Sequence, residues 1–91
     1  MYNDITVEQY QHFRLMRNRA GEYLAKGENA KSFEAILDMK RDVKAKKLHP
    51  ATFDNLLSEV IAIGHELNGD AMILIDFGQY VAKHIDRFNA I

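Results

Sequence analysis

The feature that most constrains this chain is the spacing of its apolar residues, which recur at intervals of three and four between three short breaks. That interval places side chains on one face of an α-helix. The breaks are Gly27, Pro50 and the pair Asn68-Gly69, which are residue types that end helices or form turns. The sequence therefore predicts an all-α protein of four helices. Short connections favour a compact four-helix bundle or two stacked helical hairpins, with residues 1–91 as a single domain.

A capping box marks the start of the first helix. Thr6 and Gln9 have the spacing at which each side chain hydrogen-bonds the free backbone N–H at the other position. We therefore expect the helix to begin at Thr6 or Val7 and to stop before Gly27. Its expected apolar face consists of Val7, Tyr10, Phe13, Met16, Ala20 and Leu24.

The second and third helices meet at Pro50, which fits the first turn of a helix because no backbone hydrogen bond is lost there. Asn29 or Ser32 is expected to cap the second helix. Its apolar stripe is Phe33, Ile36, Leu37 and Val43, with Met39 at the edge. The third helix has an apolar face of Phe53, Leu56, Leu57, Val60, Ile61 and Leu67. Gly64 lies on that face, where its missing side chain would let another helix approach closely.

The fourth helix is expected to follow a cap at Asp70. Residues 71–77 also fit a short buried strand, but helical spacing continues to Phe88 and favours a helix. A helix that is apolar on every side is either buried centrally or placed in an oligomer interface. We therefore expect a dimer or higher assembly through the third and fourth helices. The expected interface residues are Phe53, Leu57, Ile61, Gly64, Met72, Phe77 and Tyr80.

Composition indicates the cellular compartment in which the protein functions. The chain has no cysteine, which excludes disulfides and thiolate chemistry and favours a reducing compartment. No signal peptide is visible at the N-terminus, and the longest apolar run, at 71–75, is too short to span a membrane. We expect a cytoplasmic protein without membrane contact. Residues 1–50 carry ten Lys and Arg against seven Asp and Glu, whereas residues 51–91 carry two against six.

Basic residues form two clusters that suit an anionic partner. Lys40, Lys44 and Lys47 share a helix face near the end of the second helix, with Arg41 partly beside them. They would hold phosphate groups, although the simpler interpretation is a solvated helix end whose cations complement the helix dipole. Arg14, Arg17 and Arg19 form the second cluster, beside His12 on the first helix. They would bind phosphate or a carboxylate in a fork, or pair with acidic residues of the same chain.

No catalytic or metal-binding motif is present. The four histidines lack the spacing of a ligand set, and His84 fits a hydrogen-bonded core position. No paired carboxylates, nucleophile elbow or phosphate-binding glycine loop is found. Asp76 is expected on the outer side of the fourth helix. We therefore expect a protein that is not an enzyme and that needs no cofactor or metal.

Two families share features with parts of the chain. The run Thr52 to Leu57, followed by Gly64 and Ala71, resembles one hairpin of pentatricopeptide and tetratricopeptide repeats, which implies hairpin geometry only. The first 25 residues, with Tyr2, Arg17 and Leu24-Ala25, resemble the opening of small helical phage proteins that sequester cyclic-nucleotide immune signals. That resemblance implies that Tyr2 stacks on a base and that Arg17 meets a phosphate.

These observations favour a small regulatory protein, of the inhibitor or adaptor type and of a kind that phages encode, which acts through contacts with a protein partner or with itself. The alternative is a binder of nucleotides, such as a cyclic-nucleotide sponge, or of nucleic acid. The residues expected to bind such a ligand are Tyr2, Arg14, Arg17, Lys40, Arg41, Lys44 and Lys47.

Overall fold

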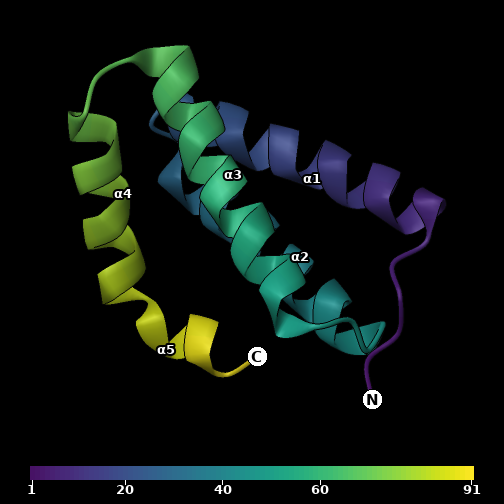
Figure 1. The fold of residues 1–91 in the computed structure, drawn as a ribbon. Helices are drawn as coiled ribbons and strands as arrows, with labels where there is room; N and C mark the ends of the chain where they lie inside the picture. Colours follow the sequence, from purple (N-terminus) through teal and green to yellow (C-terminus); the bar gives the residue numbers. More distant parts are fainter.

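The computed structural model describes residues 1–91 and confirms an all-α fold, with five helices in place of the predicted four (Figure 1). The helices are α1 (Val7–Ala25), α2 (Asn29–Ala45), α3 (Pro50–Asn68), α4 (Met72–Lys83) and α5 (Ile85–Asn89). Residues 72–77 are helical, so the strand alternative is wrong. The predicted fourth helix is interrupted at His84, where φ is −117° and ψ is 20°. There the backbone N–H of His84 bonds Val81 O, three residues back, and the ring packs against Tyr80 with centroids 4.5 Å apart.

Local signals set most helix ends as expected. Thr6 caps α1 through a complete capping box, and Gly27 adopts a left-handed φ of 71° after the helix ends. Pro50 occupies the first position of α3. The expected cap at Asp70 is displaced by one residue, because Ala71 flanks α4, but the carboxylate of Asp70 still accepts a hydrogen bond from the N–H of Met72 at 2.9 Å.

The expected cap of α2 is wrong. The flanking residue is Glu28, and no side chain caps the helix. Ser32 is fully buried, and its hydroxyl donates to the carbonyl oxygen of Ala20 at 2.9 Å. The serine therefore ties α2 to α1 in the interior of the protein, which uses the same hydrogen-bonding capacity that a cap would have used.

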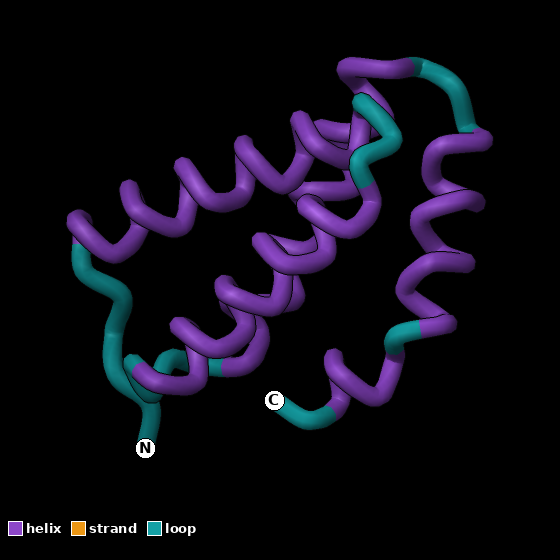
Figure 2. Tube along the Cα trace, turned by 180° about the vertical axis from the view of Figure 1, so that it is seen from behind, coloured by secondary structure: helices purple, strands orange, loops and turns teal.

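Helices α1, α2 and α3 pack together, and α4 runs along their side as a lateral arm that ends in α5 (Figures 1 and 2). The most extensive packing of α1 is with α3 and α2. Gly64 of α3 faces Leu24 of α1, and a methyl group on Gly64 would lie 2.7 Å from Leu24 Cγ. The expected close approach at Gly64 is thus present, with α1 as the neighbour. Gly21 has the reciprocal role, because a methyl group there would lie 2.7 Å from Ile63 Cβ.

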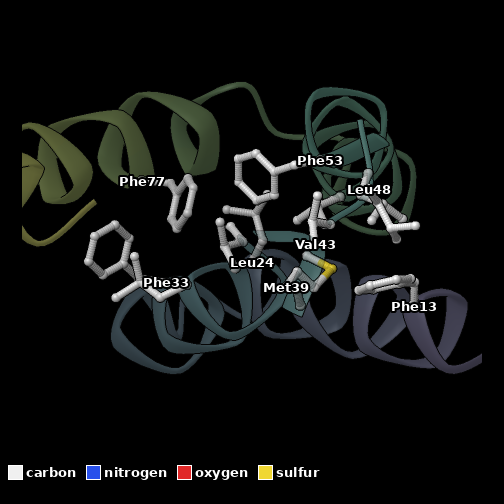
Figure 3. Close-up of a cluster of buried hydrophobic side chains, with 13 residues drawn as sticks. Phe13, Leu24, Phe33, Met39, Val43, Leu48, Phe53 and Phe77 are labelled. Atoms are coloured by element: carbon white, nitrogen blue, oxygen red, sulfur yellow. The ribbon is translucent and has the colours of Figure 1, made fainter. Parts of the chain in front are cut away.

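The core is built almost entirely by the first three helices. Its buried apolar residues are Phe13, Ala20, Leu24, Phe33, Ile36, Leu37, Met39, Val43, Leu48, Phe53, Leu56, Val60 and Phe77. Of these, Phe77 alone comes from the arm, and it reaches the cluster from α4 (Figure 3). Met39 is fully buried and does not lie at the edge of its stripe. Val7 and Tyr10, expected on the apolar face of α1, are exposed because the first turns of α1 diverge from α3 (Figure 1).

Candidate functional site

The structure brings four of the predicted ligand-binding residues to one cavity of about 390 Å³. Tyr2, Lys40, Lys44 and Lys47 line it where the end of α2 meets the start of α3. The remaining lining residues are Val43, Leu48, Pro50, Phe53, Asp54 and Ile91. Val43, Leu48 and Phe53 also belong to the core, so the cavity has a rigid apolar wall beneath its cationic side chains.

Tyr2 reaches this cavity because the segment before α1 is tied to the turn after α2. The backbone N–H of Asn3 donates to Lys47 O at 2.8 Å, and its side-chain amide donates to Lys46 O at 3.1 Å. The ring of Tyr2 packs edge-on against His49, with centroids 4.8 Å apart. The basic stretch contains no aromatic residue of its own, and the fold brings Tyr2 to it from the segment before α1.

Lys47 has an unusual backbone. Its φ is 54°, and it is the one residue other than glycine with a positive φ. This left-handed conformation costs an L-residue with a Cβ about 1 kcal/mol relative to glycine. The geometry lets Lys47 N–H bond Lys44 O at 3.1 Å and Leu48 N–H bond Val43 O at 3.0 Å, which closes the end of α2. The turn thus has the geometry of a glycine position, but it carries a lysine.

Lys40 connects the cavity to the end of the arm. Its Nζ donates to the carbonyl oxygen of Phe88 at 2.7 Å and lies 3.8 Å from the centroid of the Phe88 ring. Partial burial lowers the pKa of Lys40, and the nearby charge of Lys44 lowers it further, while Asp54 opposes the shift. Lys44 and Lys47 are exposed and form no ion pair.

The three predicted arginines lie outside this cavity. Arg17 donates to Glu59 of α3 at 2.9 Å, so it pairs with the acidic half of the chain, as one of the two sequence interpretations expected. Arg41 pairs with Asp38 at 3.0 Å on the same helix. Arg14 is exposed on α1 and forms no ion pair. The resemblance that joined Tyr2 to Arg17 therefore concerns two residues that the fold places in different surroundings.

A second candidate surface lies along α3 and α4. Met72 and Ile75 of α4 are 53% and 51% exposed, and Leu67 and Ile61 of α3 are also exposed. Between the two helices and α2 lies a groove of about 260 Å³. Its lining is apolar throughout and consists of Phe33, Ile36, Leu57, Ile61, Leu74, Phe77, Gly78, Val81 and Phe88.

The predicted interface residues divide into three groups. Phe53, Gly64 and Phe77 are buried within the single chain, Leu57 and Tyr80 are half-buried, and Ile61 and Met72 are exposed. Sequence reasoning did not include Ile75 in the interface, although its position three residues after Met72 places both on one side of α4. Asp76 is exposed, as expected.

No family model, curated protein or solved structure matches this chain. None of the five helices combines the length and apolar character needed to cross a membrane. The class that the fold defines is an all-α protein in which a lateral arm lies against three closely packed helices.

Proposed function

We propose that this protein is a small non-enzymatic binding protein that acts through protein–protein contacts, with the outer side of α3 and α4 as its contact surface. The observation that carries the proposal is the mismatch between the composition of α4 and its burial. Asp76, Gln79 and Lys83 are its only strongly polar side chains, yet Phe77 is its only buried residue.

The exposed side chains of this surface lie next to the apolar groove. Ile61 belongs to both, because it is 39% exposed and also lines the groove. Exposed apolar groups that adjoin a groove are typical of contact surfaces, since covering them removes apolar area from water. The groove accepts an apolar side chain of a partner, and Met72 and Ile75 extend the contact along α4. A second copy of this chain is the simplest partner, and another protein bound in the same way would make the chain an inhibitor or adaptor.

The test is the mass of the purified protein at micromolar concentration, measured by native mass spectrometry or light scattering. We expect a dimer or larger complex for the wild type and a monomer for Ile75→Asp. The Ile75→Asp monomer should still unfold cooperatively on heating, because Ile75 lies outside the core of the single chain. Leu15→Asp is the matched control, because Leu15 is 67% exposed on α1, far from the proposed surface in sequence and on another helix. A wild type that stays monomeric and retains no protein partner would show the proposal to be wrong.

A further inference from the structure

We propose that the cavity between the end of α2, the start of α3 and the segment before α1 binds a small organic phosphate, namely a phosphate monoester whose organic part is apolar or aromatic. The cavity shares no lining residue with the apolar groove of the proposed protein-contact surface, and the two adjoin where Lys40 contacts Phe88.

The charge of the lining fits a dianion. Among the side chains of the lining, Lys40, Lys44 and Lys47 contribute three positive charges and Asp54 one negative charge, which is a side-chain balance of two positive charges. A phosphate monoester carries between one and a half and two negative charges near neutral pH, whereas a carboxylate carries one. Lysine binds phosphate as a point charge without the flat fork that matches a carboxylate. The lining thus favours phosphate over carboxylate.

The lysines that remain without a carboxylate partner around the end of α2 are those that line the cavity. Arg41 and Lys46 each meet a carboxylate, that of Asp38 and that of Asp42. Lys44 and Lys47 meet none, and Lys40 is held by a backbone carbonyl oxygen, which leaves its charge uncompensated. The cations near the end of α2 that lie outside the cavity therefore pair with carboxylates. The lysines that line the cavity do not, so their charges can bind an anionic ligand.

The apolar part of the cavity explains why the ligand has an organic body. Val43, Leu48 and Phe53 form a buried wall, while Tyr2, which lines the same cavity, is 55% exposed. A volume of about 390 Å³ lies in the range of small-molecule sites. An aromatic or aliphatic group would pack between Tyr2 and this wall while its phosphate meets the lysines.

The backbone of Lys47 supports the same assignment. Residues in sparsely populated backbone regions cluster at binding sites, where the strain persists because the position serves the site. Here a glycine would relieve the strain and remove a cation from the cavity. The turn at Lys47 is thus less stable than one with glycine, but it places a lysine in the lining of the cavity.

Nucleic acid is a weaker interpretation of the same charges. Extended nucleic acids need a continuous basic track along their backbone. Arg17 and Arg41 are occupied by Glu59 and Asp38, and Arg14 lies on a different helix from the lysines. Around the end of α2, the lysines without an ion pair are Lys40, Lys44 and Lys47, and all three line one cavity, which suits a compact ligand.

The experiment is an NMR titration of the ¹⁵N-labelled full chain with phenyl phosphate at low salt, alongside phenol and inorganic phosphate. We expect saturating shifts for amides of residues 2–3, 40–48 and 53–54, with weaker binding of both fragments. Lys44→Ala and Lys47→Gly should each weaken binding about tenfold, because each removes one charge-assisted contact. Lys83→Ala is the matched control, since Lys83 is an exposed lysine without an ion pair on α4.

Thermal melts of the same variants separate binding from folding. Lys47→Gly should bind less well while its Tm is equal to or above that of the wild type, because glycine accepts the left-handed turn. The proposal is overturned if about 10 mM phenyl phosphate causes no saturating shifts, or if Lys44→Ala and Lys47→Gly bind as the wild type does. Equal binding of phenol overturns it as well. Tighter binding of a single-stranded oligonucleotide that shifts the α1 amides would replace it with a nucleic-acid site.

Discussion

The lateral arm α4 to α5 is richer in apolar residues than the three packed helices α1 to α3, yet much less of it is buried. All core residues except Phe77 come from the first three helices and the turn after α2. The difference lies in how closely the backbones approach. Gly21 and Gly64 let α1 and α3 meet at van der Waals distance, whereas a methyl group on Gly78 of α4 would meet nothing within 4 Å. Close backbone approach, and not apolar composition alone, decides which helices form the core.

The largest expected effect comes from a cavity in the three packed helices. Leu24→Ala should lower the free energy of unfolding by about 4 kcal/mol, because Leu24 of α1 is fully buried against Gly64 of α3. Leu15→Ala on the same helix should change it by less than about 0.5 kcal/mol, since Leu15 is 67% exposed. Urea unfolding followed by circular dichroism measures both. Equal effects of the two variants would contradict the described core.

Two glycine substitutions test the difference in backbone approach directly. Gly64→Ala should lower the free energy of unfolding by about 2 kcal/mol, because the new methyl group overlaps Leu24. Gly78→Ala should raise it by up to about 1 kcal/mol, because alanine favours a helix and the methyl group meets open space. The Tm values of Gly64→Ala and Gly78→Ala, compared with that of the wild type, test this difference in backbone approach. A loss of stability at Gly78 would mean that the arm packs more closely than described.

The attachment of the arm is expected to depend on Lys40. Lys40→Met removes the hydrogen bond from Nζ to Phe88 O and should weaken the docking of α5 by about 1 kcal/mol. Hydrogen exchange of the α5 amides should then be about fivefold faster, while the amides of α1 to α3 keep their protection. Uniform acceleration across the chain would show that the arm and the three helices unfold as one unit.

The smallest effect concerns alkaline pH. The pKa of Lys40 in the folded protein is lowered from 10.5, mainly by burial, so the unfolded chain holds the proton more tightly. Between the two pKa values the unfolded state binds more protons, and the free energy of unfolding contributed by Lys40 therefore rises with pH. The measurement is the difference in stability between wild type and Lys40→Met as pH increases through this window. As pH increases, the free energy of unfolding of the wild type should rise relative to that of Lys40→Met. A relative fall would show that the pKa of Lys40 is not lowered in the folded protein.

Signals that act within a few residues were readable from the sequence. The capping box at Thr6, the stop at Gly27 and the start at Pro50 depend on the chemistry of neighbouring residues, and each has its expected place. Most features that depend on a distant segment were missed, although the close approach at Gly64 was expected. Gly21 does not interrupt α1, and its importance comes from Ile63 of α3. Ser32 has the residue type of a cap, but its partner is Ala20 of the preceding helix.

At the candidate sites, too, the individual residues could be selected from the sequence, but the contacts that bring them together could not. Tyr2 and the lysines at 40, 44 and 47 were each selected from the sequence, yet nothing in it links the first residues to the end of α2. The link is made by the hydrogen bonds of Asn3 to the turn at Lys46 and Lys47. Arg17 was selected for the same ligand, and its partner Glu59 became identifiable only when α3 was placed beside α1.

The meeting of the two ends of the described chain has a consequence for protein engineering. Tyr2 and Ile91 line the same cavity, and both ends lie on one side of the molecule (Figure 2). A short glycine and serine linker would therefore join residue 91 to residue 1 without disturbing the helices, and the chain could be reopened at Gly27 or Gly69, whose added side chains would meet nothing within 4 Å. Such circular permutants would reorder the helices along the chain while keeping their packing, with the linker passing beside the cavity.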